Sequence, residues 1–237
     1  MTVTLTARVD RLDWSALATE LDDIGHAVTP PLLTAEECRR VAAWFDEPER
    51  FRSTVDMARH RFGEGRYRYF ADPLPAEVAE LRAAFYPRLA PVANRWAEQL
   101  GGDERWPLAL TALRDLCAAA GQKRPTPLIL RYDAGGYNCL HQDLYGDVWF
   151  PLQVVIGLDE PGADFTGGEV LLVEQRPRAQ SRGEAITLQQ GQAMVFPTRH
   201  RPALGARGYH RVQVRHGASR IRSGRRHALG LIFHDAR

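Results

Sequence analysis

The chain has 237 residues, of which 44% are hydrophobic and 25% charged, and this is the composition of an ordinary globular protein with a substantial core. Its three cysteines, Cys38, Cys117 and Cys139, have no CxxC spacing, which argues against a disulfide framework and against a zinc knuckle. The longest apolar runs, such as 154–156, are too short to cross a bilayer, and residues 1–10 lack the pattern of a signal peptide. We therefore expect a cytoplasmic protein with no membrane contact.

The net charge of +2 is distributed unevenly along the chain. Residues 171–237 hold 13 arginines, no lysine and three acidic residues, a net charge of about +10, so residues 1–170 carry about −8. A basic half would suit phosphates or nucleic acid. Because Lys123 is the only lysine, however, arginine is also this chain's general choice of cation, and both interpretations stay open.

Residues 1–125 are predicted to be mainly helical. Thr34 precedes two glutamates and an apolar series, so it could cap a helix. Between residues 78 and 100 the apolar positions recur at steps of three and four, which indicates one buried helical face. Pro87 and Pro91 interrupt this segment and predict a kink or two consecutive helices. A further short helix is expected over residues 107–120.

After residue 125, short β-rich runs alternate with glycine, proline and aspartate. The expected strands are Leu128–Asp133, Trp149–Leu158, Glu169–Glu174, Ala185–Leu188, Ala193–Phe196, Tyr209–His216 and His227–His234. Residues 176–183 and 200–208 are expected to be loops. Many short strands without helices between them favour a sandwich or jelly roll over a parallel sheet. We therefore predict a single α+β domain over residues 1–237, with mainly helical residues 1–125 packed on a jelly-roll core over 126–237.

A candidate metal motif follows the first expected strand. His141 and Asp143 stand two residues apart, so at the end of a strand their side chains point the same way. Two histidines and one carboxylate on one face of a non-haem iron leave coordination positions free for other ligands. The pair alone is common by chance, and a polar strand-end pair would explain it as well.

A second histidine and an arginine complete the pattern. His216 ends a predicted strand, a glycine turn is expected at Ser223–Gly224, and the next strand begins near Arg226. Two antiparallel neighbours could then aim His216 and Arg226 into one cavity. His210 shares the strand face of His216 and is the rival ligand. It lies sixteen residues before Arg226, whereas His216 lies ten residues before it.

The last strand predicts where this arginine points. Arg226, Ala228, Gly230 and Ile232 share one face, and the small residues among them leave room for a ligand inside the sheet. A buried guanidinium without a partner is very costly, and its planar fork suits a carboxylate.

The chain resembles the iron(II)/2-oxoglutarate-dependent oxygenase superfamily, and more closely a bacterial family of such oxygenases described as nucleic-acid-modifying. The matching stretches are Phe51–Ser53, Tyr67–Phe70, Arg124–Leu128, Asn138–Gly146, Asp164–Glu169, Arg215–Gly217 and Ile232–Asp235. The resemblance covers nearly the whole chain and implies a double-stranded β-helix (jelly-roll, cupin-like) core. It also implies iron(II) at His141, Asp143 and His216, with 2-oxoglutarate and dioxygen as co-substrates and Arg226 on the 2-oxoglutarate carboxylate.

The implied reaction is hydroxylation of a C–H bond, or oxidative demethylation where the carbon is an N-methyl group. The substrate would be a small molecule or amino-acid-like group, or alternatively a nucleobase in nucleic acid. A non-enzymatic jelly-roll binding module is the remote alternative. The oligomeric state is not predicted.

Several further residues are candidates for the site. A looser likeness to prolyl-4-hydroxylase-type members, through their spacing Tyr-x-x-Gly-x5-His-x-Asp, gives Tyr132 a role in holding the co-substrate, although a core tyrosine would fit as well. Gln153, a polar residue among apolar ones, could contact the co-substrate or be a satisfied core amide. The expected substrate-side residues are Asn138, Tyr145, Trp149, Arg66 and Tyr69. The last two belong to the run 66–70, which could grip nucleotides or form an amphipathic strand over the barrel mouth.

Overall fold

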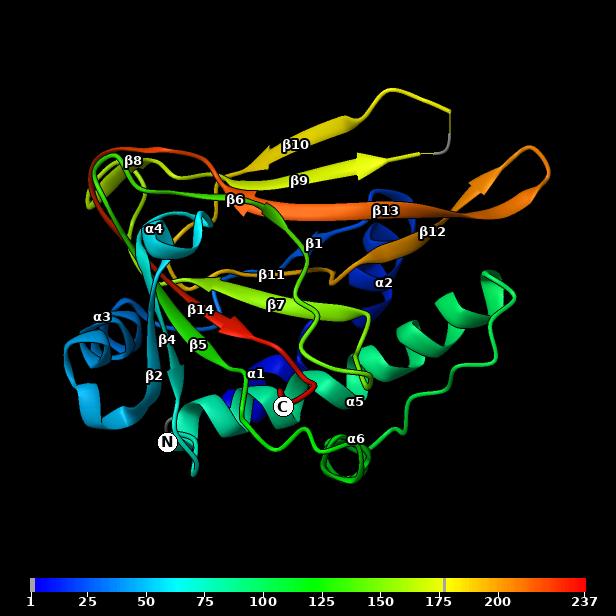
Figure 1. The fold of residues 1–237 in the computed structure, drawn as a ribbon, viewed down its shortest axis with the longest axis horizontal. Helices are drawn as coiled ribbons and strands as arrows, with labels where there is room; N and C mark the ends of the chain where they lie inside the picture. Colours follow the sequence, from blue (N-terminus) through cyan, green and yellow to red (C-terminus); the bar gives the residue numbers. More distant parts are fainter. Residues whose placement is uncertain (1–2, 177) are drawn as a thin grey trace.

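The structure is a computed structural model that describes residues 3–176 and 178–237 (Figure 1). Its helices are α1 (Leu5–Asp10), α2 (Trp14–Asp23), α3 (Ala35–Ala43), α4 (Met57–His60), α5 (Ala76–Gln99) and α6 (Leu110–Ala119), with 3-10 turns η1 (Trp44–Asp46) and η2 (Pro48–Arg50). The strands of the first half are β1 (Ala27–Val28), β2 (Phe51–Asp56), β3 (Gly63–Glu64) and β4 (Arg66–Phe70). Those of the second half are β5 (Leu128–Asp133), β6 (Tyr137–His141), β7 (Leu152–Gly157), β8 (Phe165–Gly167), β9 (Val170–Gln175), β10 (Arg182–Ile186), β11 (Ala193–Pro197), β12 (His200–Gly205), β13 (Gly208–Ala218) and β14 (Ile221–Leu231).

These strands form two antiparallel sheets that face each other (Figure 1). The larger sheet has the order β1-β11-β7-β14-β5-β4-β2, with β8 paired to β14. The smaller sheet has the order β10-β9-β13-β6-β3, with β12 paired to β13. The helices α1, α5 and α6 lie on the side of the larger sheet that faces away from the smaller one (Figure 1). This arrangement confirms the predicted α+β class with a jelly-roll core and helices packed on it.

Helix α5 supplies most of the surface that covers the larger sheet. It is one element over Ala76–Gln99, so the expected division into two helices is wrong. Pro87 and Pro91 lie on the exposed side of the helix. Neither proline has an N–H, so the carbonyls of residues 83 and 87, one turn earlier, have no helical hydrogen bond. Residues 83 and 87 are exposed as well. Water can solvate those carbonyls, which removes the reason for the helix to end.

The main core lies between α5 and the outer face of the larger sheet, and a smaller cluster between the sheets joins residues such as Met194 and Phe196 to Leu172 and Val214, next to a cavity. Core side chains from the sheet and its ends are Ile129, Phe150, Leu152, Val154, Ile156, Leu229, Leu231 and Phe233. Because side chains alternate along a strand, burying these positions against helices turns their neighbours, such as Tyr132, Gln153 and Arg226, toward the space between the sheets. The larger core therefore fixes the orientation of the residues inside the sandwich.

The N-terminal half holds more strand than its predicted helical character suggested. Strands β2 and β4 form a hairpin that extends the larger sheet beyond β5. Residues 66–70, for which a strand was one of two predictions, form β4, and burial increases along the strand from Arg66 to Phe70. Helix α3 begins as predicted, because Thr34 and Glu37 form a reciprocal capping box. Among the described residues no helix is long and apolar enough to span a membrane.

Two expected loops need correction. Residues 200–205, which contain a proline and a glycine, form β12, an edge strand whose one partner among the described strands is β13. Pro202 is tolerated there because an edge strand does not need every N–H. Strand β10 begins at Arg182 rather than Ala185, so the loop before it is shorter than expected.

The connection between His216 and Arg226 also differs from the prediction. Strand β13 ends at Ala218 and β14 begins at Ile221, so the chain turns at residues 219–220 and not at Ser223–Gly224. Gly224 lies inside β14 opposite Phe165, at a φ of 77°, beside a register shift in the pairing with β8. The two strands then enter different sheets, so His216 and Arg226 approach the cavity from opposite walls rather than from neighbouring strands.

Candidate metal centre

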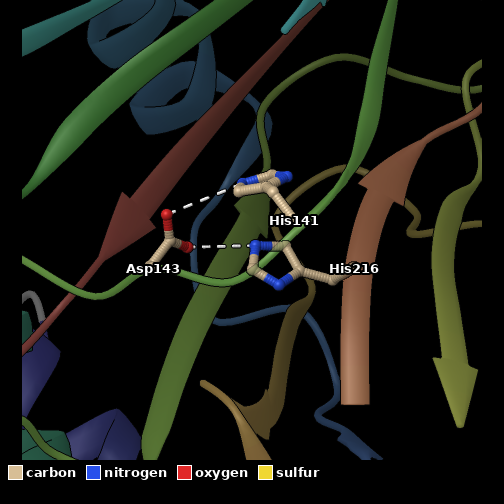
Figure 2. Close-up of side chains that lie close together, drawn as sticks. All are labelled: His141, Asp143 and His216. Carbon is tan, nitrogen blue, oxygen red and sulfur yellow. Dashed lines mark ion pairs between the residues drawn. The ribbon is translucent and has the colours of Figure 1, made fainter. Parts of the chain in front are cut away.

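Three side chains from the smaller sheet and the loop after it meet at one point (Figure 2). His141 ends β6 and pairs in register with His216 of β13, while Asp143 follows in the loop. His216 Nε2 lies 3.0 Å from Asp143 Oδ2, and His141 Nε2 lies 3.6 Å from Asp143 Oδ1. One potential ligand atom from each residue lies within 4.8 Å of the others. The spacing His-x-Asp therefore brings its two side chains to the same point as the distal histidine.

Asp143 and His216 are buried and His141 is partly exposed, and this shapes the electrostatics of the cluster. Burial alone would raise the pKa of Asp143, but the charges and hydrogen bonds of His216 and His141 hold that pKa well below its usual range. Burial and the neighbouring His141 lower the pKa of His216. For His141, burial opposes protonation, and the hydrogen bond and charge of Asp143 outweigh it and raise the pKa. The carboxylate is thus ionised and His216 favours its neutral form, which are the states that bind metals.

The tautomer of His141 is set by its backbone. Its Nδ1 lies 2.8 Å from the carbonyl oxygen of Cys139, so Nδ1–H donates there and Nε2 is the ring nitrogen that faces Asp143 and remains available to a metal. Among the described residues, this trio is the group of three or more histidine, cysteine or acidic side chains close enough to hold a metal ion. His210, the rival ligand, lies six residues from His216 on β13 and is not part of it.

The donor set fits one class of metal site. Two neutral imidazoles and one carboxylate form the 2-His-1-carboxylate set that holds non-haem iron and leaves positions free for other ligands. The arrangement can therefore bind a redox metal together with a chelating co-substrate.

The cluster lines a cavity of about 380 Å³ between the two sheets. That volume falls within the range of small-molecule sites. The walls are mainly apolar, with side chains such as Val155, Phe196 and Ala228, and a few polar groups converge on the same space. As predicted, Arg226, Ala228 and Gly230 of β14 line it together with Ile232, the residue after that strand.

Arg226 is the buried cation of the cavity wall, with an exposed fraction of 5%. No hydrogen bond or ion pair of its guanidinium occurs among the described residues; its nearest aromatic neighbour is Tyr132, with the guanidinium carbon 5.9 Å from the ring centroid. Burial lowers the pKa of Arg226, and burial raises that of Tyr132, an effect that Arg226 and a hydrogen bond from Asn138 oppose. Gly168 approaches so closely that an added Cβ would lie 3.0 Å from the arginine Cδ.

Gln153 and Asn138 both reach the cavity, as expected. Gln153 is 3% exposed, and its Nε2 has no hydrogen-bond acceptor in the described part of the chain. It lies opposite Phe196 in the sheet register, and the Phe196 ring is 4.9 Å from that of His216. An unused donor is thus available close to the metal cluster.

The other substrate-side candidates separate into two groups. Tyr69 and Tyr145 line the cavity, and the Tyr145 hydroxyl donates to Asp143 Oδ1 over 2.7 Å. Trp149 does not line it; its ring packs against Trp106, 6.0 Å away between centroids, so its expected place at the mouth is corrected. Arg66 is exposed at the start of β4 and also lies outside the wall. In each case strand alternation or a neighbouring aromatic ring turns the side chain away from the cavity.

The rim contains residues that sequence reasoning missed. Arg61 and Phe62, between α4 and β3, line the opening together with Leu140 of β6. Arg61 has a φ of 60°, and the ring of Phe62, which is 47% exposed, stacks on His60 with centroids 5.4 Å apart. The alternation of basic and aromatic residues over 59–62 was the available signal, but it lies some eighty residues before the metal motif.

The fold is similar to that of several solved oxygenase structures. A Pseudomonas putida prolyl-4-hydroxylase aligns with a TM-score of 0.54 and 17% identity, covering 94% of this chain and 99% of that one. An oxidoreductase of the 2OG-Fe(II) oxygenase family from Burkholderia pseudomallei gives a TM-score of 0.55 at 16% identity, with coverages of 94% and 92%. The chain therefore has the fold seen in 2OG-Fe(II) oxygenases.

Sequence comparison identifies the family. The model of the family Oxygenase-NA, described as "Oxygenase, catalysing oxidative methylation of damaged DNA", matches residues 65–236. The chain belongs to this oxygenase family. It is also 49% identical over 210 residues to the uncharacterized protein Rv2227 of Mycobacterium tuberculosis, a match that covers 83% of this chain and 90% of that protein.

Proposed function

We propose that this chain is an iron(II)- and 2-oxoglutarate-dependent dioxygenase that hydroxylates, or oxidatively demethylates, a C–H bond of its substrate. In this proposal His141, Asp143 and His216 hold the iron, and the whole chain forms one oxygenase domain. The observation that carries the proposal is Arg226, a buried guanidinium that has no hydrogen-bonding partner among the described residues and lines the same cavity as the trio. A charge buried in this way calls for an anion of matching shape.

The side chains of the cavity divide the work of binding. Arg226 would take the distal carboxylate of 2-oxoglutarate in two parallel hydrogen bonds, with the hydroxyl of Tyr132 beside it. Gln153 would donate its unused N–H to the end of 2-oxoglutarate that lies at the metal. Iron(II) with 2-oxoglutarate and dioxygen supplies the oxidising chemistry that attacks the C–H bond. The apolar wall would keep bulk water away from that chemistry.

A small molecule or an amino-acid-like group is the first candidate substrate. The cavity lies between two sheets, and its volume of about 380 Å³ must hold both co-substrate and substrate. Apart from Asp143 and Arg226, most of its inner wall is apolar or aromatic. These features suit a compact group that enters the sandwich.

A nucleobase is the second candidate. It is favoured by the description of the family and by the rim, where the exposed ring of Phe62 lies between Arg61 and the start of β3. Aromatic rings stack on unpaired bases, and arginines attract phosphates. A base would have to leave its stack to reach the cluster.

The experiment that tests the proposal is an anaerobic titration of metal-free protein with iron(II) in the presence of 2-oxoglutarate. A visible charge-transfer band that saturates at one iron per chain is expected, and it should be absent from His216→Ala but retained in His210→Ala. Retention in His216→Ala with loss in His210→Ala would overturn the ligand assignment. Without any band, a jelly-roll binding module becomes the better description. Succinate release with single-stranded oligonucleotides and with amino acids, assayed side by side, then separates the two substrate classes.

A further inference from the structure

A chain of hydroxyl groups leads to the carboxylate of the metal cluster. The Tyr145 hydroxyl donates to Asp143 Oδ1 over 2.7 Å, and the Tyr69 hydroxyl donates to the Tyr145 oxygen over 3.0 Å. Both donors point toward Asp143, so each hydrogen bond polarises the next one. The chain joins β4 of the larger sheet to the loop that follows β6.

Asp143 needs such support because of where it lies. It follows the end of β6, in a loop, and no strand pairing fixes its backbone. Among the described residues, its carboxylate oxygens have three partners, His141, His216 and Tyr145. The two histidines are candidate ligands, so Tyr145 is the partner that a bound metal would leave in place.

The two tyrosines are themselves held firmly. Tyr69 is 9% exposed, and the guanidinium of Arg52 lies 4.5 Å from the centroid of its ring. Arg52 is fixed in turn by a hydrogen bond of 2.9 Å from its Nε to the carbonyl of Pro125. The Tyr145 ring packs edge-on against that of Tyr69, with centroids 6.1 Å apart. The donor to Asp143 therefore has little freedom to rotate.

From this geometry we infer that Tyr145, held by Tyr69, is a positioning residue for Asp143. Its hydroxyl occupies Oδ1 and leaves Oδ2, the oxygen beside His216 Nε2, for the metal. The inference rests on the proposed metal site and extends it to a residue that is not itself a candidate metal ligand. Hydrogen-bond partners of metal ligands fix the ligand's orientation, and their loss typically costs roughly 10- to 100-fold in metal affinity.

Cobalt(II) binding to the metal-free protein tests this inference without any turnover, because its visible absorption reports both affinity and coordination geometry. Tyr145→Phe removes one hydroxyl and keeps the ring. We expect roughly 10- to 100-fold weaker cobalt binding and an altered spectrum. Tyr69→Phe should weaken binding less, and adding it to Tyr145→Phe should cost nothing more, because Tyr69 acts through Tyr145.

Tyr86→Phe is the matched control. Tyr86 is fully buried, and its hydroxyl donates to the Pro107 carbonyl over 2.7 Å, away from the cavity. The Tyr86→Phe variant also loses one tyrosine hydroxyl hydrogen bond and should bind cobalt as the wild type does. Wild-type affinity and spectrum in Tyr145→Phe would overturn the positioning role while leaving the metal site intact. Failure of the wild-type protein to bind cobalt or iron would overturn both.

Discussion

Arg82, in the middle of α5, and Arg226, on β14, are both buried, and they differ in what surrounds their guanidinium groups. Arg82 donates to the carbonyls of Ile232 and Phe233 and pairs with Asp235 at 2.7 Å. Arg226 has no such partner in the described chain. One charge is neutralised by the protein that buries it, and the other calls for a partner from outside.

The contrast extends to the regions around these arginines. Near the C-terminal segment, the side chains of Gln122 and Thr126 donate hydrogen bonds to the carbonyls of Asp235 and His234. In the cavity, Gln153 Nε2 and His216 Nδ1 have no partner among the described residues. Buried polar atoms of the described chain also lack partners outside the cavity, as at His234 Nε2 and His200 Nδ1, so the binding site is marked by the position of Arg226 and Gln153 on the wall of a ligand-sized cavity.

Two buried aspartates test this contrast most strongly. Asp143→Asn keeps the shape of the side chain and removes its charge from the metal cluster. We expect metal binding and turnover to fall to background, because an amide is a poor substitute for an anionic ligand. The unfolding free energy should stay within about 1 kcal/mol of the wild type, since Tyr145 can still donate to the amide oxygen. Co-substrate decarboxylation and urea denaturation measure the two effects, and normal turnover would remove Asp143 from the ligand set.

The corresponding change at Asp235 should have the opposite outcome. Asp235→Asn leaves the Arg82 charge buried without a counter-ion, and we expect a loss of about 3–5 kcal/mol in unfolding free energy. Arg114 also reaches Asp235, at 3.4 Å, but its side chain is 48% exposed, so Arg114→Ala should cost less than about 1 kcal/mol. Urea denaturation compares the variants. Equal stability of Asp235→Asn and wild type would mean that the carbonyls alone satisfy Arg82.

Much of the candidate site could be predicted from the sequence, because its signals are local. The step of two between His141 and Asp143 and the alternation along β14 each follow from strand geometry, and the structure brings the residues together as expected. What could not be predicted depends on the pairing of distant strands. Strands β13 and β14 enter different sheets because their pairing partners differ and lie far along the chain. Strand β13 pairs with β9 and β6, and β14 pairs with β5 and β7.

The same limit explains the individual errors. Residues 200–205 have the composition of a loop, and only their pairing with β13 makes them a strand. Trp149 stands six residues after Asp143, yet its ring packs against that of Trp106 and does not line the cavity. The contact of Tyr145 with Asp143 had a local signal, the same step of two along a loop, but which atom its hydroxyl meets depends on Tyr69 from β4.

Arg226 itself should show the reverse of the stability effect at Asp235. Arg226→Ala removes a charge without a partner, so we expect the unfolding free energy of the co-substrate-free protein to be unchanged or higher. Binding of 2-oxoglutarate to the metal-loaded protein should weaken by about 2–3 kcal/mol, or roughly 30- to 150-fold. The neighbouring Arg225 is half-exposed and pairs with Asp133, so Arg225→Ala is the control and should bind normally. Equal 2-oxoglutarate affinity in Arg226→Ala and wild type would contradict the assignment.

A small effect on stability is also expected for a paired arginine that lies nearer the surface. Arg8 binds both carboxylate oxygens of Glu37, and this hydrogen bonding lowers the pKa of Glu37 from its ordinary value of 4.5 to about 2. Because the pKa is lower in the folded state, the pair stabilises the fold above pH 4.5, and the contribution is lost as the pH falls toward 2. Glu37→Gln keeps an oxygen for the N-terminal cap at Thr34 and should cost only about 1 kcal/mol at neutral pH. Urea denaturation of both proteins from pH 7 to pH 3 should show this difference narrowing below pH 4.5. A difference in unfolding free energy that does not change with pH would mean that Glu37 stabilises the fold through its cap and not through its charge. Pairing an arginine with a carboxylate would then stabilise this fold only where the arginine is buried.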